Sequence, residues 1–304
     1  MSKRFAVIIV NYNVADYIES LISSIYKNID SKNFEIIIVD NNSSERDIEN
    51  IKNLFPEVNL ILLKENKGFS GGNNYGAEVS NSEYVVFINP DTLLENDCIS
   101  PLVDQLEEKS NIGIITSILK YGDKSYQSAY GKSRGIFIEL IDALYITKYP
   151  YLVFKKTSMY LREKLSKPFD VKWVSGAFMV MKKDIFIKAG SFDIAYPLNY
   201  EDMDLCKNVL NLDLKIKVDP GQYLIHFESK SQKKNFYNFV YKRYVSKLIY
   251  LKKHLNPLQG IIIKYIHVFG LYLRLMFLFT VMDLNERSER KRAFKDSLKL
   301  YLNK

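Results

Sequence analysis

Acidic side chains follow two short apolar runs of the chain, at places where a carboxylate could bind a ligand. Asp40 directly follows the run Phe34–Val39, and Asp91 follows Tyr84–Ile88 and the pair Asn89–Pro90. An acid at the carboxyl end of a strand faces the crevice in which α/β sheets bind ligands. Asp40 could accept hydrogen bonds from a nucleobase or ribose there, and Asp91 could hold a divalent cation against a diphosphate. Each could equally be a turn or helix-capping residue.

Three more carboxylates stand together in Glu201-Asp202-Met203-Asp204, at the expected start of a helix. Glu201 and Asp204 share a face of such a helix, and Asp202 points elsewhere. One of them could act as general base on a hydroxyl group. Acids in a first helical turn also complement the helix dipole, so a structural role explains the cluster equally well.

Two further features could contact a ligand. His226 ends a short predicted strand; a lone histidine is more often structural, but this position favours contact with a metal or phosphate. The glycine-rich stretch Asn66–Gly76 is expected to be a loop that leads into a helix near Ala77. It matches neither a dinucleotide fingerprint nor a Walker-type phosphate loop. Its glycines would allow close approach to a ligand, although a plain flexible connection fits as well.

The elements that must position these residues alternate between strand and helix. Apolar, β-branched runs predict strands, and apolar residues at helical spacing predict helices between them. The predicted strands are 5–10, 34–39, 58–63, 84–88, 112–119, 177–181, 214–218 and 223–227, and the predicted helices 16–26, 48–55, 96–109 and 200–212. This order predicts an α/β fold with a mostly parallel sheet. Residues 121–172 lack a clear period and predict substrate-facing loops with one or two short helices.

Charge divides the chain near residue 230. The formal net charge is +8, but the segment 230–304 holds 17 Lys/Arg and 4 Asp/Glu, whereas the remainder holds 26 and 31. The C-terminal part is therefore expected to face something anionic, either a membrane surface or nucleic acid. Cys98 and Cys206 lie far apart without metal-site spacing, which fits a reducing compartment. The first apolar run, 5–10, is too short for a signal peptide, so we expect a cytoplasmic protein.

The C-terminal part is predicted to be helical at 231–254, 260–282 and 286–302. The middle stretch is about long enough to span a bilayer. However, Lys264, His267 and Arg274 interrupt it within an arc of about 80°. This pattern favours a helix that lies in the membrane interface over one that spans it, with packing on the chain itself or on a second subunit as the alternative. Residues 258–304 are therefore expected to dock peripherally on an anionic membrane surface.

Several motifs, taken together and in order, resemble the family 2 inverting glycosyltransferases, with the rhamnosyltransferase-like branch as the nearest match. The resemblance covers about residues 4–230. The motifs that carry it are Val7–Asn13, Val39–Ser43, Asn66–Phe69, Asn89–Asp91, Trp173–Ala177 and Glu201–Asp204.

This resemblance implies a GT-A fold, in which helices flank a Rossmann-like, mostly parallel central sheet. The catalytic domain would span 1–230, with a nucleotide-sugar half at about 1–120 and an acceptor half at about 121–230, followed by the helical extension 231–304. The implied activity is metal-dependent transfer of a sugar from dTDP-rhamnose or a UDP-hexose to a hydroxyl of a glycan acceptor, expected to be lipid-linked. Such an enzyme would serve bacterial polysaccharide or cell-surface glycan synthesis.

The resemblance also implies roles for single residues. Asp202 would be the catalytic base, and Asp91 and His226 would hold Mn²⁺ or Mg²⁺. The motif Asn89-Pro90-Asp91 offers one acid where the family pattern has two, so phosphate oxygens and water must complete the coordination shell. The residues expected to bind the nucleotide-sugar are Asn11, Asp40, Asn42, Lys67, Gly68, Asn89, Asp91, Gly176, Glu201 and Lys230.

Two other classes of function stay open on the sequence. A sugar nucleotidyltransferase shares the fold class and the metal chemistry but needs no base such as Asp202. A non-enzymatic nucleic-acid-binding protein is suggested by the pI of 9.1 and by the basic, aromatic C-terminal part. Of the three classes, we favour the glycosyltransferase. Its expected partners are a nucleotide-sugar, a glycan acceptor and a membrane surface, with homodimerisation as an option and no nucleic acid.

Overall fold

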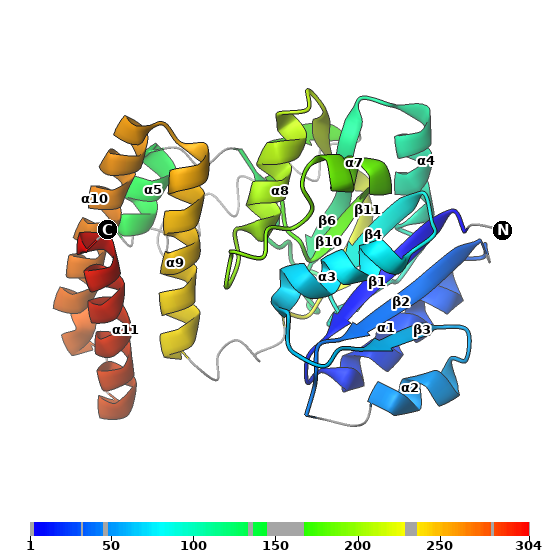
Figure 1. The fold of residues 1–304 in the computed structure, drawn as a ribbon, viewed down its shortest axis with the longest axis horizontal. Coiled ribbons are helices and arrows are strands. Elements are labelled where there is room, and N and C mark those ends of the chain that lie inside the picture. The colour runs from blue at the N-terminus through cyan, green and yellow to red at the C-terminus, as the bar shows by residue number, and fades with distance from the viewer. Residues whose placement is uncertain are drawn as a thin grey trace. The chain divides into compact units, whose positions relative to one another are not determined.

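The computed structural model describes residues 3–31, 33–44, 48–132, 136–144, 167–228, 236–280 and 283–303 (Figure 1). The chain divides into two compact units. The sheet unit comprises residues 1–132, 165–194 and 201–228, and the helical unit comprises residues 133–164, 195–200 and 229–304. Lys230 was expected to bind the nucleotide-sugar, and it lies outside the described residues.

A nine-stranded sheet forms the centre of the sheet unit, and its first half is parallel. The apolar, β-branched runs 5–10, 34–39 and 84–88 are largely buried on both faces, as strands inside a parallel sheet require, whereas the edge strand at 59–62 is partly exposed. The register sets Asn11 beside Asp40 and Ile9 beside Ile88, so the polar residues after these strands meet at one edge. In spatial order the four strands are β3 (Asn59–Leu62), β2 (Phe34–Asp40), β1 (Phe5–Asn11) and β4 (Tyr84–Ile88).

The second half of the sheet is mixed. β10 (Phe178–Lys182) runs antiparallel to β4 and to β6 (Ile112–Lys120), and β6 pairs in parallel with β11 (Lys215–His226). The sequence predicted two strands in place of β11, but they form one strand with an irregularity between Asp219 and Tyr223. The short strands β5 (Thr92–Leu93) and β8 (Phe169–Val171) flank β11, and β7 (Tyr130–Gly131) pairs with β9 (Trp173–Val174) in a separate sheet.

Helices cover both faces of the nine-stranded sheet. Successive side chains of β1 point to opposite faces of the sheet, which explains this arrangement. Val7 and Ile9 pack in one apolar cluster, and Ala6 and Ile8 pack in the other. The first cluster includes residues of α1 (Ala15–Asn28), α2 (Ile48–Leu54) and α4 (Ser100–Glu108). The second includes residues of α3 (Gly68–Val79), α7 (Lys183–Lys188) and α8 (Glu201–Leu210). Both cysteines are free and buried.

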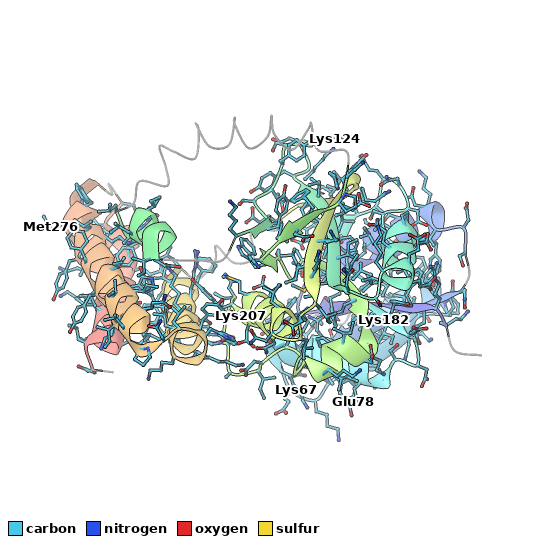
Figure 2. The ribbon with its side chains drawn as sticks, turned by 90° about the horizontal axis from the view of Figure 1, so that it is seen from above. Lys67, Glu78, Lys124, Lys182, Lys207 and Met276 are labelled. Carbon is cyan, nitrogen blue, oxygen red and sulfur yellow. The ribbon has the colours of Figure 1, made fainter. Side chains whose placement is uncertain are left out.

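The glycine-rich stretch is a helix, so the loop predicted there was wrong. Lys67 and Glu78, labelled in Figure 2, lie at the two ends of α3. Two of its glycines face β1: a Cβ added to Gly72 would lie 2.8 Å from Val10 Cγ1, and one added to Gly76 would lie 2.5 Å from Ile8 Cγ2. Close packing of helix on strand therefore outweighs the low helix propensity of glycine.

Four helices make up the described part of the helical unit. Apolar side chains of α9, α10 and α11 form its core, with Leu271 and Tyr301 fully buried. Pro257 opens α10, where its missing N–H costs nothing, and the Asn256 side chain caps the helix by accepting from Gln259 N at 2.9 Å. The helices are α5 (Ile136–Ala143), α9 (Phe236–His254), α10 (Pro257–Met276) and α11 (Leu284–Leu302), with a 3₁₀ turn at Phe277–Thr280.

Candidate active site

The ends of β1 and β2 carry a buried group of hydrogen bonds around Asp40. Its Oδ1 accepts from Asn11 Nδ2 at 2.7 Å and from Ser43 Oγ at 2.7 Å, and its Oδ2 accepts from Ser43 N at 3.0 Å. The carboxylate thus holds the turn after β2, which is the structural role that the sequence left open. Asn42 lies in this turn with φ +60° and an exposed side chain. Contact of either residue with a nucleotide stays a prediction.

Asn41 joins this turn to the start of α3. Its Nδ2 donates to Gly68 O at 2.8 Å, and its Oδ1 accepts from Lys67 N at 2.8 Å. Because one amide group bonds both backbone positions, it fixes Lys67 and Gly68 against the end of β2. The Lys67 ammonium extends toward solvent, 4.0 Å from Glu65.

Gly176 connects α3 with the carboxylates of α8. Its backbone N donates to Asp202 Oδ2 at 3.0 Å. A Cβ added to Gly176 would lie 3.0 Å from Phe69 Cζ and 3.5 Å from Asp202 Cβ. The absence of a side chain therefore lets the Phe69 ring and Asp202 approach Gly176 together.

Glu201 and Asp202 form a pair of adjacent carboxyls at the start of α8. Burial raises the pKa of both, and the charge of Asp202 raises the pKa of Glu201 further. The N–H groups of Gly176 and Met203 oppose the rise at Asp202, whose Oδ1 accepts from Met203 N at 2.7 Å. Glu201 Oε2 has no hydrogen-bond partner in the described part of the chain. We therefore place a shared proton on Glu201 and the negative charge on Asp202.

Asp91 and His226 face each other where β5 pairs with β11, because that pairing sets His226 beside Thr92. Asp91 Oδ1 lies 3.4 Å from His226 Nε2, and Asn89 Nδ2 lies 3.4 Å from the same nitrogen. Gln127 Nε2 donates to His226 O at 2.6 Å, which leaves Gln127 Oε1 to accept from His226 Nδ1 at 2.9 Å. The Nε2 atom therefore presents a lone pair toward the buried Asp91 carboxylate.

This donor set suits a divalent cation such as Mn²⁺ or Mg²⁺. An imidazole lone pair and a carboxylate oxygen point to one place, and an amide group orients the ring, as is usual around metal-binding histidines. No group of three or more His, Cys, Asp or Glu side chains that could hold a metal occurs among the residues the structure describes. Two protein ligands leave positions for phosphate oxygens and water, which is how Mg²⁺ usually binds.

Backbone hydrogen bonds connect these groups. Asn89 N donates to Ala177 O at 3.0 Å, which joins the segment that carries Asp91 to the residue after Gly176. The antiparallel register of β10 on β4, with Phe178 beside Ile88, produces this contact. Contacts therefore run from Phe69 of α3 through Gly176 to Asp202, and from Ala177 through Asn89 to His226.

Four residues of this site were absent from the list predicted to act there. Asn41 and Ser43 belong to the motif Val39–Ser43, and their polarity was the only signal of a role in the site. Phe69 belongs to the motif Asn66–Phe69, but its contact with Gly176 depends on the register of β10. Gln127 stands in no motif, and only the fold brings it to His226, 99 positions later.

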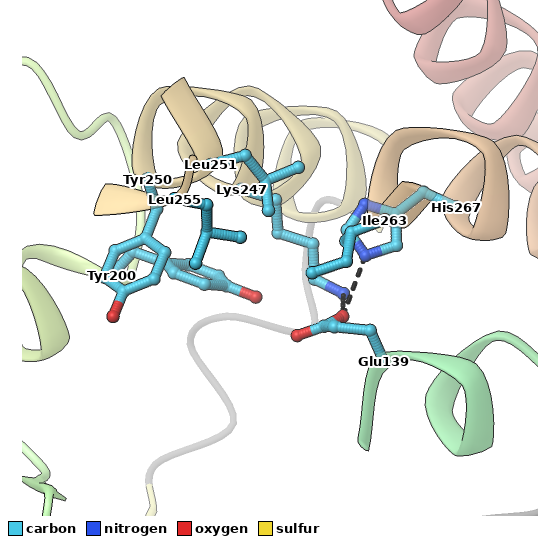
Figure 3. Close-up of a pocket in the computed structure, with 8 residues that line it drawn as sticks. All are labelled: Glu139, Tyr200, Lys247, Tyr250, Leu251, Leu255, Ile263 and His267. Carbon is cyan, nitrogen blue, oxygen red and sulfur yellow. Dashed lines mark hydrogen bonds and ion pairs between the residues drawn. The ribbon is translucent and has the colours of Figure 1, made fainter. Parts of the chain in front are cut away.

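Two hollows lie elsewhere. In the helical unit, Glu139 Oε2 accepts from His267 Nε2 at 2.8 Å and from Lys247 Nζ at 3.3 Å, beside a cavity of about 10 Å³ (Figure 3). That volume has room for roughly one water and excludes a sugar. An open hollow of about 330 Å³ is lined by Lys182, which pairs with the first residue of β4 and so lies at the other end of that strand from Asp91.

The sequence resembles those of known glycosyltransferases. The family described as Glycosyl transferase family 2 matches residues 6–190. The rhamnosyltransferase WbbL of Escherichia coli K12 is 25% identical over 73% of this chain and 82% of its own length. A poly-beta-1,6-N-acetyl-D-glucosamine synthase of Staphylococcus aureus is 24% identical over 64% of this chain and 47% of its own length.

Two solved structures share the fold. GalNAc-T7 with UDP, GalNAc and Mn²⁺ has a TM-score of 0.60 at 13% identity, covering 100% of this chain and 56% of that one. The mannosyltransferase PcManGT of Pyrobaculum calidifontis, with GDP-Man and Mn²⁺, has a TM-score of 0.59 at 13% identity, covering 99% and 87%. They confirm the predicted GT-A fold. With the family match across more than half of its length, the chain belongs to glycosyl transferase family 2.

Proposed function

We propose that the protein transfers a sugar, with inversion, from a nucleotide-diphospho-sugar to a hydroxyl of a glycan acceptor. The observation that carries this proposal is the series of contacts through the neighbours Gly176 and Ala177, of which Gly176 bonds to Asp202 and Ala177 bonds to Asn89, beside the Asp91–His226 pair. These contacts support a base and a metal–diphosphate site within one active site. The similarity to a rhamnosyltransferase supports dTDP-rhamnose as donor, with a UDP-hexose as the alternative, and a role in bacterial polysaccharide synthesis.

Asp202 serves as the general base in this proposal. Its carboxylate takes the proton of the acceptor hydroxyl as that oxygen bonds to the anomeric carbon, while the bond from that carbon to the diphosphate breaks and the nucleoside diphosphate leaves with the electron pair. Backbone N–H groups of Gly176 and Met203 hold the carboxylate in orientation. Because attack comes from the face opposite the leaving group, a single displacement inverts the anomeric configuration.

Asp91 and His226 would hold the divalent cation, and Gln127 keeps the imidazole in the tautomer that can bind it. A bound Mn²⁺ or Mg²⁺ supplies positive charge to the departing diphosphate. Asn41, which fixes Lys67 and Gly68, places a cation and a backbone turn at the same edge of the sheet. An anionic nucleotide is complementary to that edge.

We further propose that the acceptor is lipid-linked and that the enzyme works peripherally at the cytoplasmic side of the cell membrane. Charge supports this location, because residues 236–303 contain 13 Lys/Arg and only 4 Asp/Glu. Anionic lipid attracts such a segment.

Titration calorimetry tests the assignment of roles. Asp202→Asn is expected to abolish transfer while donor affinity stays nearly that of the wild type, and Asp91→Ala is expected to lose both. Asp184→Asn, which makes the same carboxyl-to-amide change on the exposed surface of α7, should retain both. Wild-type transfer rates in Asp202→Asn would refute its role as base, and unchanged donor affinity in Asp91→Ala would refute the metal–diphosphate site.

A further inference from the structure

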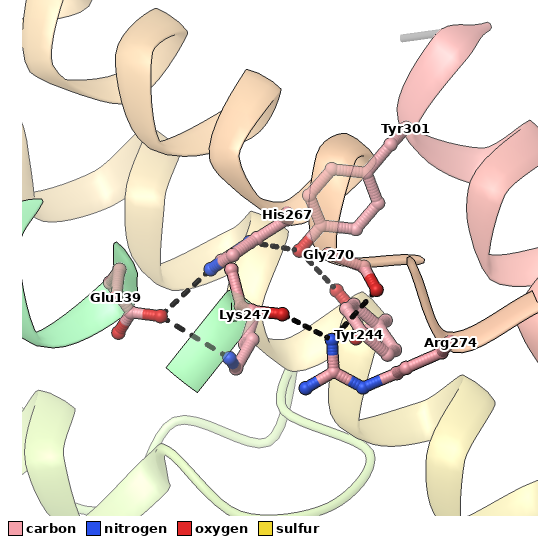
Figure 4. Close-up of polar contacts among 8 residues, drawn as sticks. Glu139, Tyr244, Lys247, His267, Gly270, Arg274 and Tyr301 are labelled. Atoms are coloured by element: carbon pink, nitrogen blue, oxygen red, sulfur yellow. Dashed lines mark hydrogen bonds and ion pairs between the residues drawn. The ribbon is translucent and has the colours of Figure 1, made fainter. Parts of the chain in front are cut away.

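The polar face of α10 is turned into the helical unit. His267 is buried; its Nε2 donates to Glu139 Oε2 at 2.8 Å, and its Nδ1 lies 3.0 Å from the Tyr301 hydroxyl (Figure 4). Arg274 donates to Gly270 O at 2.9 Å and to Ala143 O at 3.3 Å. The sequence predicted that these residues share a face, but an interfacial helix would ordinarily turn that face to water. Here other groups of the protein, and not water, form hydrogen bonds with His267 and Arg274.

The opposite face of α10 is apolar and exposed. At about 100° per residue its members fall within an arc of about 100°, and no charged residue of the helix lies in that arc. Their exposed fractions run from 38% at Ile262 to 69% at Leu258. This outer stripe consists of Leu258, Ile261, Ile262, Tyr265, Phe269, Tyr272 and Met276, the last labelled in Figure 2.

We propose that the outer stripe of α10 is the surface that inserts into an anionic membrane, between the headgroups and the acyl chains. The proposal deepens the location proposed above, which rests on charge alone. A continuous, exposed apolar face made by seven residues is typical of an interaction site. Aromatic and aliphatic residues on the inserted face, in a unit rich in Lys and Arg, are the composition of interfacial helices.

Lying in the interface fits α10 better than crossing the membrane. By length and apolar composition the helix could span a bilayer, with a mean hydropathy of 1.2. However, His267 and Arg274 tie it to α5 and to Tyr301 of α11. A spanning α10 would carry this charged network into hydrocarbon, which is costly. Insertion of the outer stripe alone leaves the network in place.

Charge favours lipid over a second copy of the chain. Two helical units facing each other would each bring 13 basic and 4 acidic side chains from residues 236–303, and would repel. An anionic lipid surface is complementary to the same charge. The outer stripe supplies the apolar contact in either case, so the net charge decides between the two partners.

Flotation of the full-length protein with vesicles tests the proposal. Binding is measured to phosphatidylcholine alone and to a mixture of phosphatidylcholine and phosphatidylglycerol, for wild type, Phe269→Glu and Tyr265→Glu. Gln259→Glu is the matched control, because it adds the same charge at an exposed position of α10 outside the outer stripe. We expect the two stripe variants to lose roughly tenfold or more in binding to the mixed vesicles, and the control to bind like wild type.

Two measurements keep the outcome decisive. Circular dichroism and donor binding should be unchanged in both stripe variants, so loss of fold or of the proposed donor site would be recognised separately. Equal vesicle binding by Phe269→Glu and wild type would overturn the proposal. A wild-type dimer in light scattering that becomes monomeric in Phe269→Glu, without vesicle binding by either, would assign the outer stripe to a second copy of the chain and also overturn it.

Discussion

Replacing Glu201 by glutamine should change how stability depends on pH. Burial and the charge of Asp202 raise the pKa of Glu201 from 4.5 to about 8. Between these values the folded protein holds a proton that the unfolded chain has released. Stability therefore falls as pH rises from about 4.5 toward 8, at about 1.4 kcal/mol per pH unit. At pH 7 the cost for the wild type is on the order of 3 kcal/mol.

Glutamine keeps the shape of a protonated glutamate but does not titrate. Near pH 4, where Glu201 is protonated in both states, the two proteins should differ only by a small constant. At pH 7 the variant should be more stable by about 3 kcal/mol relative to that constant. The comparison of two pH values removes the fixed cost of a buried amide, which is the same at both.

Urea unfolding of both proteins at several pH values measures this effect. Trp173 is the single tryptophan, so its fluorescence reports on the sheet unit that holds Glu201. Glu83→Gln is the control, because Glu83 is an exposed partner of Lys182 and its pair should contribute less than about 1 kcal/mol. A difference between Glu201→Gln and wild type that is equal at pH 4 and pH 7 would show that Glu201 is not held protonated.

Three further substitutions test the packing of α3 and the orientation of His226. Gly72→Ala should destabilise by about 1–3 kcal/mol because its Cβ would lie 2.8 Å from Val10 Cγ1, whereas Gly260→Ala, in open space within α10, should stabilise by about 0.5–1 kcal/mol; denaturant unfolding in which both behave alike would contradict the packing argument. Gln127→Leu should weaken Mn²⁺ affinity by about 10- to 100-fold, since it removes the acceptor that fixes the imidazole tautomer of His226. Calorimetry showing unchanged affinity would remove Gln127 from the metal site.

The strands of the parallel half of the sheet could be predicted because their local pattern and their buried environment agree. A run such as Phe5–Val10 is continuous, apolar and β-branched, which suits a strand covered on both faces. The stretch 66–76 failed because glycine content indicates a loop locally, while the contacts of Gly72 and Gly76 with β1 decide the structure. Those contacts exist only once the helix lies on the sheet, so no local property reports them.

The site shows the same division. Asp91, Asp202 and His226 could be proposed because each stands in or near a motif, and strand ends concentrate ligand-binding residues. Gln127 could not, because its partner is 99 residues away and its sequence surroundings are ordinary. Gly176 was among the residues predicted to bind the nucleotide-sugar, but its packing could not be predicted, since it depends on Phe69 and Asp202 approaching from two helices.

The orientation of α10 is the case in which the helix's own sequence is least informative. Periodicity places Lys264, His267 and Arg274 on one side and the outer stripe on the other. It does not decide which side is buried, because a polar face can be satisfied by water or by protein. Glu139, 128 residues before His267, supplies the missing partner and turns the polar face inward. The apolar face of α10 is then left exposed. This exposure follows from the pairing of His267 with Glu139, which the sequence of α10 alone cannot predict.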